Sequence, residues 1–376
     1  MSKNGRTLAI VINTSWNIYN FRIGLLKSLQ REGYRIVTIA PRDSYSQKLE
    51  ALGFEYHNIN INNMGTNPFE DIKLIWNFYR LYKKINPDIL LHYTIKPNIY
   101  GTIAARLAGV PVINNISGLG TVFLNHNFSS RVARLLYKIA LLSPAKVFYQ
   151  NEDDRSLFID LKLVDKEKTG LLPGSGIDTA KFSPVDAECV DSAFTFLFIA
   201  RLVKDKGLVE YVEAARILKV KYPEVQFAVL GAFYPGNPTA ITEEEMAEWK
   251  REGIVKYLGT NDDVSSVIAQ SDCVVLPSYR EGMSRVLLEA ASMAKPIVAT
   301  DVPGCRDIVD DGVNGFLCKV KDVEDLAAQM EKIIQIGDAQ RIQMGKKGRE
   351  KVINEFDESI VIASYKLAIS STLQQV

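Results

Sequence analysis

The chain alternates short β-branched runs with longer segments of helical periodicity, and it does so in two successive series. The first series opens with TLAIVI at 7–12, a helical pattern, and YRIVTIA at 34–40. After a turn-rich segment at 171–193, the alternation restarts with FTFLFIA at 194–200. Strands that alternate with helices form parallel sheets with helices on both faces. The predicted fold class is therefore α/β, with two Rossmann-like, doubly wound domains.

The length of the chain also indicates two domains. Its 376 residues exceed the roughly 250–300 at which a single hydrophobic core stops growing. We place the first domain at 1–187, the second at 188–355, and a C-terminal helix at 356–376 that we expect to pack back on the first domain. Ligands of parallel sheets bind beyond the carboxyl ends of the strands, so we expect the active site in a cleft between the domains.

The net charge of +1 is a sum of two halves of opposite sign. Residues 1–187 contain 23 Lys+Arg and 15 Asp+Glu, whereas residues 188–376 contain 45−23=22 and 44−15=29. No acidic residue occurs from Ile89 to Asn151, although six basic residues lie there. This pattern predicts an anionic partner for the first half.

Neither the cysteines nor the apolar segments indicate an extracellular or membrane-spanning chain. The four cysteines show no C-x-x-C spacing, and no segment approaches 18 uncharged apolar residues. We therefore expect a cytoplasmic protein that is soluble or peripheral to a membrane.

The stretch EGMSRVLLE sets Glu281 and Glu289 eight positions apart, at the junction of a loop and a predicted helix. Ser284 is a good N-cap, and Gly282 allows a ligand to approach the backbone beside an anion-binding helix N-terminus. Carboxylates can accept paired hydrogen bonds from the hydroxyls of a sugar or a ribose. The alternative is that Glu281 is a solvated loop charge and Glu289 a surface helix residue.

A second motif, FIARLVKDKG, places Arg201 and Lys206 directly after a predicted strand. Two cations at the carboxyl end of a sheet suit a diphosphate, and each charge-assisted hydrogen bond contributes roughly 1.5–3 kcal/mol. The alternative is a pair of exposed cations, which are common after any strand.

These motifs, together with GSGID followed by Phe182 and with DGVNGFL, resemble the retaining GT-B glycosyltransferases of family 4 in order and spacing. The resemblance covers nearly the whole chain. It implies that Arg201 and Lys206 hold the donor diphosphate, that Glu281 contacts the donor sugar, and that Glu289 accepts hydrogen bonds from the ribose. Arg201, Lys206 and Glu281 are the expected catalytic residues. The full donor-binding set is Arg201, Lys206, Glu281, Gly282, Met283, Ser284, Arg285 and Glu289.

The first domain is similar to family members that extend lipid-linked saccharides, including the galactosaminyltransferase of bacterial N-glycan assembly. The expected acceptor-binding residues are Asn17, Lys96, Ser117, Gly118, Arg131, Arg134 and Lys138. Many relatives carry His before GLG, whereas this chain has Ser117, so an imidazole role does not carry over. The chain also lacks Asp-x-Asp, and the clusters EDD at 152–154 and EEE at 243–245 look like exposed charges. We expect no metal cofactor, since Arg201 and Lys206 can stabilise the leaving diphosphate.

In SSRVARLLYKIALL, Arg131, Arg134 and Lys138 lie on one helical face beside a stripe of Leu135, Ile139 and Leu142. This arrangement suits an anionic membrane surface or a lipid diphosphate. The alternative is an ordinary amphipathic helix that packs through its leucines.

The sequence therefore predicts an enzyme, a retaining glycosyltransferase peripheral to the inner face of the plasma membrane. It is expected to move an N-acetylhexosamine such as GalNAc from a UDP-sugar to an undecaprenyl-diphosphate-linked saccharide, with no nucleic-acid partner. The alternatives are a non-hydrolysing UDP-sugar 2-epimerase of the same architecture and a non-catalytic sugar-nucleotide binding protein.

Overall fold

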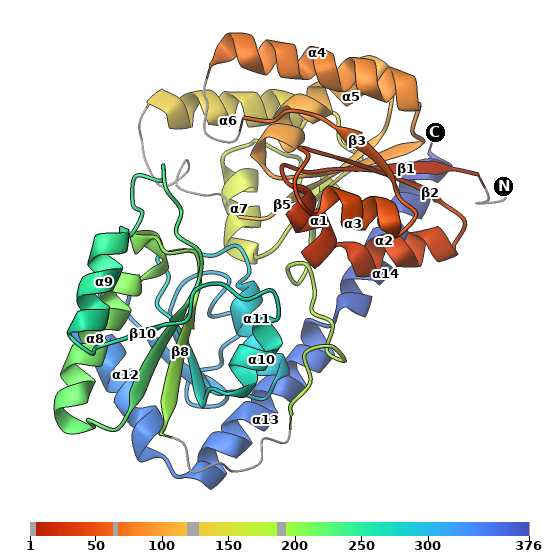
Figure 1. Cartoon of the computed structure of the whole chain (residues 1–376). Helices are drawn as coiled ribbons and strands as arrows, with labels where there is room; N and C mark the ends of the chain where they lie inside the picture. The colour runs from red at the N-terminus through yellow and green to blue at the C-terminus, as the bar shows by residue number, and fades with distance from the viewer. Residues whose placement is uncertain (1–4, 63–66, 119–127, 186–192, 376) are drawn as a thin grey trace. The chain divides into compact units, whose positions relative to one another are not determined.

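The computed structural model describes residues 5–62, 67–118, 128–185 and 193–375 (Figure 1). The chain forms two compact units. Unit 1 comprises Met1–Gly176 and Glu358–Val376, and unit 2 comprises Ile177–Asp357. Each unit has a parallel sheet, as the alternating pattern predicts.

Unit 1 is built on a seven-stranded parallel sheet with the order β3-β2-β1-β4-β5-β6-β7. Its central strands are fully buried, which explains their nearly continuous apolar sequences. The strands are β1 (Thr7–Val11), β2 (Arg35–Ala40), β3 (Glu55–Asn58), β4 (Ile89–Tyr93), β5 (Val112–Ile116), β6 (Lys146–Tyr149) and β7 (Thr169–Leu171).

Helices cover the sheet of unit 1 on both faces and form two separate cores. One core is packed by α1 (Ser15–Phe21), α2 (Ile23–Arg31), α3 (Ser46–Ala51) and α14 (Glu358–Gln374). The other is packed by α4 (Pro68–Ile85), the π-helical turn η1 (Pro97–Gly101), α5 (Thr102–Ala108), α6 (Phe128–Ala140) and α7 (Glu152–Asp160).

A buried histidine joins three elements of unit 1. The ring of His92 in β4 lies 3.0 Å from the Tyr82 hydroxyl of α4 and 3.1 Å from the Thr102 hydroxyl of α5. Burial lowers the pKa of His92 to about 3, so the imidazole is neutral at pH 7. His92 therefore has a structural role.

Unit 2 contains a six-stranded parallel sheet with the order β10-β9-β8-β11-β12-β13. The strands are β8 (Thr195–Ile199), β9 (Gln226–Leu230), β10 (Lys256–Tyr257), β11 (Cys273–Leu276), β12 (Ile297–Thr300) and β13 (Gly315–Cys318). The helices are α8 (Leu208–Lys221), α9 (Glu243–Arg251), α10 (Val264–Ala269), α11 (Arg285–Ser292), α12 (Val323–Gln335) and α13 (Asp338–Glu355).

Unit 2 begins at Ile177, ahead of the boundary that the sequence pattern placed at 187/188. The reason is that Ile177 and Phe182 are buried in the core of unit 2, although they precede its first strand. The carbonyl of Phe182 accepts a hydrogen bond from the Ser292 hydroxyl of α11 at 2.6 Å. The point at which the strand–helix alternation restarts marks the first strand of a unit. It does not show to which unit the preceding segment belongs.

The C-terminal helix α14 belongs to unit 1. Its residues Val361, Tyr365 and Ile369 are buried in the same core as β1 and β4. The Tyr365 hydroxyl accepts a hydrogen bond from the Asn115 side-chain amide of β5 at 3.0 Å. The chain thus returns to its first unit and completes one face of that sheet.

We predict that Tyr365→Ala lowers the free energy of unfolding of unit 1 by about 3–5 kcal/mol, since it empties a buried aromatic site. Leu367→Ala is the matched control, because Leu367 lies on the same helix and is 71% exposed. The control should shift stability by no more than about 0.5 kcal/mol. Denaturant unfolding measures both, and equal midpoints for the two variants would contradict the role of α14.

Candidate functional site

The order of the strands in unit 2 reverses between β8 and β11. From β8 the chain builds outward through β9 and β10, and it then returns to place β11 on the other side of β8. In open parallel sheets, ligands bind beyond the carboxyl ends of the strands at such a reversal. Both loops that carry the predicted catalytic residues follow these two strands: Arg201 and Lys206 follow β8, and Glu281 follows β11.

Lys206 and Glu281 form an ion pair and a short hydrogen bond between Nζ and Oε1. Their side chains are only 20% and 13% exposed. Glu281 is therefore not a solvated loop charge, and Lys206 is not a free surface cation. The pair brings a hydrogen-bond donor, Lys206, and an acceptor, Glu281, together at the carboxyl ends of the strands.

Two glycines let neighbouring backbone approach the loop that carries Glu281. Gly207 has φ +76°, and a Cβ there would lie 2.0 Å from the carbonyl oxygen of Pro277. Gly304 has φ +75°, and its Cβ would lie 2.6 Å from the carbonyl oxygen of Gly282. Any side chain at either position would push the loop away, so both glycines help to position the ion pair.

The segment from Gly282 to Ser284 leads directly into α11. The Ser284 backbone amide donates to the carbonyl of Gly304 at 3.1 Å, and its hydroxyl accepts from the Leu287 amide at 3.5 Å. Ser284 is therefore the N-cap, as predicted. Gly282 and Met283 lie between Glu281 and this cap, where the helix N-terminus favours negative charge.

Glu289 is buried within α11 and is not a surface helix residue. Only 7% of the residue is exposed, and its Oε1 accepts from Arg285 Nε at 2.9 Å. Burial raises the pKa of the Glu289 carboxyl above its usual range, while the charge of Arg285 opposes that shift. A nearly buried carboxylate with one paired oxygen offers a second oxygen for a ligand hydroxyl.

Arg201 contacts an aromatic ring of a neighbouring loop. Its guanidinium sits 5.0 Å from the ring centroid of Tyr234, which follows β9. In the part of the chain that the structure describes, no hydrogen bond or ion pair joins Arg201 to Lys206 or Glu281. The exposed guanidinium stacks on an aromatic ring and keeps its donors available.

Four predicted acceptor residues follow strands of the unit 1 sheet. Asn17 comes after β1, Lys96 after β4, and Ser117 and Gly118 after β5. The Asn17 Oδ1 atom is buried without a hydrogen-bond partner among the described residues. Lys96 is engaged, since its Nζ pairs with Asp71 at 2.8 Å.

The remaining predicted acceptor residues lie on α6. Arg131 and Lys138 are exposed and Arg134 is partly buried. The apolar stripe of α6 is also exposed, because α6 packs through Tyr137 and Ala140. The exposed fractions are 59% for Leu135, 45% for Ile139 and 61% for Leu142. Leu136 and Leu141 of the same segment do pack against the core, so α6 is an amphipathic helix that packs through two of its leucines and leaves the stripe of Leu135, Ile139 and Leu142 in solvent.

Several contacts at the site were not foreseen from sequence. Tyr234 supports Arg201 from a loop that showed no motif. The guanidinium of Arg349 donates to the carbonyls of Phe182 and Ser292 and so ties the segment that follows GSGID to α11. These partners lie far from each other along the chain, and no local pattern indicates them.

The acidic clusters are helix starts. Residues 152–154 form the first turn of α7, where Asp154 is buried with Asn151, so Asp154 is not the exposed charge that was expected. Residues 243–245 open α9 with a capping box between Thr242 and Glu245. Among the described residues, no group of three His, Cys, Asp or Glu side chains is placed to bind a metal ion.

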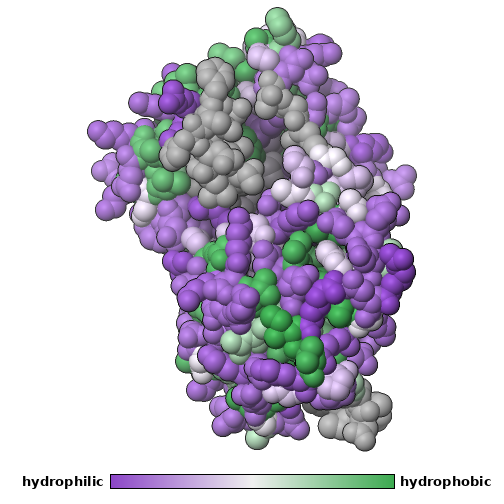
Figure 2. Space-filling view, turned by 90° about the vertical axis from the view of Figure 1, so that its left-hand side faces the viewer, coloured by the Kyte–Doolittle hydropathy of each residue, from purple (hydrophilic) through white to green (hydrophobic). Residues whose placement is uncertain are grey.

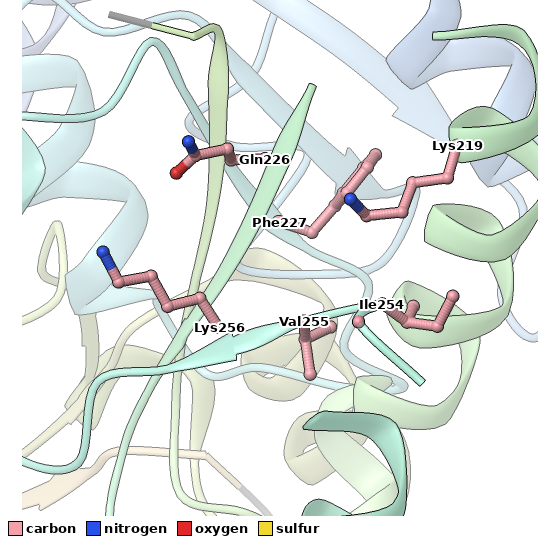
Figure 3. Close-up of a pocket in the computed structure, with 7 residues that line it drawn as sticks. Lys219, Gln226, Phe227, Ile254, Val255 and Lys256 are labelled. Carbon is pink, nitrogen blue, oxygen red and sulfur yellow. The ribbon is translucent and has the colours of Figure 1, made fainter. Parts of the chain in front are cut away.

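A separate cavity of about 300 Å³ lies on unit 2, between β9, β10 and the end of α8 (Figure 3). Gln226 and Lys256 are the first residues of their strands, so the cavity opens at the amino ends of the strands. Lys219 lies over the Phe227 ring, 6.0 Å from its centroid. The cavity is therefore at the opposite edge of the sheet from Lys206 and Glu281.

No helix within the described ranges is both long and apolar enough to span a bilayer. On the face shown in Figure 2, hydrophilic residues cover most of the surface and hydrophobic residues form patches among them.

Two family models match the chain. The model of glycosyl transferases group 1 matches residues 186–351, and that of glycosyl transferase 4-like proteins matches residues 8–151. The chain is 27% identical over 365 residues to the N,N'-diacetylbacillosaminyl-diphospho-undecaprenol alpha-1,3-N-acetylgalactosaminyltransferase of Campylobacter jejuni, covering 93% of this chain and 94% of that one. It is also 27% identical to an Escherichia coli UDP-Gal:alpha-D-GlcNAc-diphosphoundecaprenol alpha-1,3-galactosyltransferase, covering 77% and 76%.

Solved structures share the fold. A glycosyltransferase from Rickettsia africae superposes with a TM-score of 0.80 at 18% identity and covers 99% of this chain and 100% of its own. Anabaena HepE, in complex with UDP and glucose, superposes with a TM-score of 0.81 at 20% identity, covering 97% and 99%. With both Rossmann-like units matched by family models and by whole-chain relatives, the chain belongs to the glycosyltransferases of the GT-B fold and is a transferase.

Proposed function

We propose that the chain is a retaining glycosyltransferase that moves a sugar from a UDP-sugar to an undecaprenyl-diphosphate-linked saccharide. The Lys206–Glu281 ion pair at the strand reversal of unit 2 is the observation that carries this proposal. It places a cation for a diphosphate beside a carboxylate for sugar hydroxyls. The 2-epimerase alternative has no comparable support, because the family models and whole-chain relatives are those of transferases.

The donor is proposed to bind across the loops after β8 and β11. Lys206 and Arg201 contact the diphosphate, assisted by the N-terminus of α11 at Gly282, Met283 and Ser284. Glu281 accepts hydrogen bonds from the transferred sugar. Glu289, held by Arg285, accepts from the ribose hydroxyls. UDP as the carrier is supported by Anabaena HepE, which was crystallised with UDP and glucose.

The reaction proposed is a front-face displacement. The bond between the anomeric carbon and the donor phosphate oxygen breaks as the acceptor hydroxyl oxygen bonds to that carbon from the same side. The acceptor proton passes to the departing phosphate oxygen, so no side chain is required as the base. Ser117 in place of a histidine is compatible with this route. Lys206 and Arg201 stabilise the charge that develops on the diphosphate.

The acceptor is proposed to bind unit 1. The Campylobacter jejuni and Escherichia coli relatives are named for undecaprenol-linked diphospho-saccharides, which supports this class of acceptor. Arg131, Arg134 and Lys138 of α6 are proposed to contact the lipid diphosphate or the anionic membrane surface, and Asn17, Ser117 and Gly118 the saccharide. Since Lys96 is paired with Asp71, its contribution requires that this ion pair opens. The location proposed is cytoplasmic and peripheral, on the inner face of the plasma membrane.

The direct test incubates the protein with a panel of nucleotide sugars and undecaprenyl-diphosphate saccharides and identifies the product by mass spectrometry. A mass gain of one N-acetylhexosamine, from UDP-GalNAc, with the α-anomer by NMR, is the expected result. An inverted anomer would contradict the retaining mechanism. Nucleotide release that does not depend on the acceptor would contradict transfer.

We predict that Lys206→Ala lowers kcat about 100–1000-fold, because the cation acts mainly as charge develops on the leaving diphosphate. Lys204→Ala is the matched control, since Lys204 lies two residues away, is exposed, and faces Glu245 at 3.5 Å. The control should keep the parental kcat. A Lys206→Ala enzyme with near-parental kcat would remove Lys206 from the donor site.

We predict that the donor KM rises as the pH falls through the raised pKa of Glu289. The carboxylate form accepts hydrogen bonds from hydroxyls, and it is lost below that pKa, at a pH above the usual glutamate range. Glu289→Gln should raise the donor KM about tenfold or more at neutral pH and abolish this pH dependence. Steady-state kinetics between pH 5 and 8 provide the measurement. An unchanged pH profile in Glu289→Gln would assign the titration to another group.

We predict that the initial rate in excess EDTA stays near the rate without chelator, because Arg201, Lys206 and the α11 N-terminus already supply positive potential. Loss of turnover on chelation that Mn²⁺ or Mg²⁺ restores would show that the diphosphate needs a metal ion.

A further inference from the structure

The solvent side of α4 carries large apolar side chains. Phe69, Ile72 and Trp76 are 84%, 65% and 57% exposed and follow the i, i+3, i+7 spacing of one helical face. The Trp76 ring stacks on Tyr79, with centroids 5.4 Å apart. The opposite side of α4 packs into the core through Leu74, Phe78, Tyr82 and Ile85. This helix therefore has apolar residues on two opposite sides, and only one of them is used in the fold.

Basic residues surround the exposed apolar side chains of α4. From Ile72 to Ile85 the helix contains four basic residues and no acidic one. The four, all exposed, are Lys73, Arg80, Lys83 and Lys84. Of the two acids in the first turn, Glu70 accepts from Asn62 at 3.1 Å and Asp71 is paired with Lys96. We call Phe69, Ile72, Trp76 and the four basic residues the α4 outer face.

The neighbouring helices continue this surface. The helices α4, α5 and α6 pack against the same core of unit 1, so their exposed sides form the outside of one layer (Figure 1). The exposed apolar residues of the other two helices are Leu107 on α5, Val132, Leu135 and Ile139 on α6, and Leu142 just beyond it. In Figure 2, hydrophobic and hydrophilic residues are intermixed at the top of the view, where α4 lies.

We propose that the α4 outer face docks the chain on an anionic lipid bilayer, with Phe69 and Trp76 inserted below the headgroups. Helices that lie in a membrane interface combine aromatic and aliphatic side chains on one side with flanking lysines and arginines. Moving the exposed aromatic rings from water into the bilayer is favourable, because it removes apolar surface from water. The four cations are in addition attracted by anionic headgroups. The inference rests on the proposed function, since a lipid-linked acceptor requires an enzyme at the membrane surface, and it adds a second helix to α6.

The charge pattern favours a bilayer over a second copy of the chain. A two-fold contact through the α4 outer face would bring its four cations against their symmetry mates, and like charges at such an interface repel. An anionic bilayer attracts the cations through its headgroups and takes up the apolar side chains in its interior.

The test is flotation of the full chain with vesicles of phosphatidylglycerol and phosphatidylcholine. The double variant Phe69→Ser/Trp76→Ser should partition into anionic vesicles on the order of a hundredfold less than the parent. Val220→Ser is the control, because Val220 is 86% exposed on α8 of unit 2, and it should partition as the parent does. Thermal unfolding of the variants checks that unit 1 stays folded. Equal partitioning of the double variant and the parent overturns the proposal.

Fluorescence gives a second readout that a folding defect cannot imitate. The chain has three tryptophans, and Trp76 is the one on the α4 outer face. Lipids with brominated acyl chains should quench the parent, whereas Trp76→Phe should still bind vesicles and lose that quenching. A bound parent without quenching overturns insertion. The parent could instead dimerise in the absence of vesicles, and the double variant could abolish that dimer. This result would identify the face as a contact between copies of the chain and would also overturn the proposal.

Failure of this inference can be told apart from failure of the proposed function. Transfer to a detergent-solubilised lipid-linked acceptor, without binding to vesicles, overturns docking alone. Binding to vesicles through Phe69 and Trp76, without transfer to any acceptor, overturns the proposed function and leaves docking in place.

Discussion

The reversal of strand order between β8 and β11 is the constraint on which the candidate site depends. Parallel strands deliver the loops that follow them to one edge of the sheet, because each connection must cross back over a face. At the reversal, the connections after β8 and β11 run to opposite sides of the sheet. The carboxyl ends of these two strands are therefore left uncovered between them. Lys206 and Glu281, 75 residues apart in sequence, meet there. The buried strands beneath them hold both loops in place.

Electrostatic pairing keeps the charged groups of this edge balanced before a ligand binds. Lys206 is balanced by Glu281, and Glu289 by Arg285, with the four side chains at most 20% exposed. Unpaired charges with so little solvent access would cost several kcal/mol each. In the proposed reaction a diphosphate replaces Glu281 as the counterion of Lys206, which frees Glu281 to accept hydrogen bonds from the sugar. The same pairing thus stabilises the unliganded chain and prepares both groups for the donor.

Unit 1 has a different electrostatic and surface character. Its stretch from Ile89 to Asn151 has no acidic residue, and its outer helical layer exposes apolar side chains among cations. Neither feature follows from the needs of the core, because α4 and α6 each pack through another side. Both features fit an anionic, partly apolar partner, which is the chemistry of a lipid-linked diphosphate in a bilayer.

The sequence by itself determined the fold class, the central strands and the long helices, because their apolar residues repeat with periods of two or 3.6. It also located the loops that carry Arg201, Lys206 and Glu281, since each follows a strongly apolar strand. The edge strands β3, β7 and β13 are short and only partly buried, so the sequence pattern does not reveal them. Periodicity shows which residues are apolar, and it does not show which side of a helix the fold will cover.

Only the tertiary structure decided the partners and the burial of the site residues. Lys206 meets Glu281, Lys96 meets Asp71, and Arg201 meets Tyr234 across distances along the chain that no local pattern spans. Tertiary packing also buries Glu289, for which the sequence left a surface position open as the alternative, and leaves Leu135 exposed, although a leucine on an amphipathic helix usually packs. The physical reason is that side-chain partners and solvent access depend on how separate elements pack together, whereas the sequence pattern records only the preference of each element.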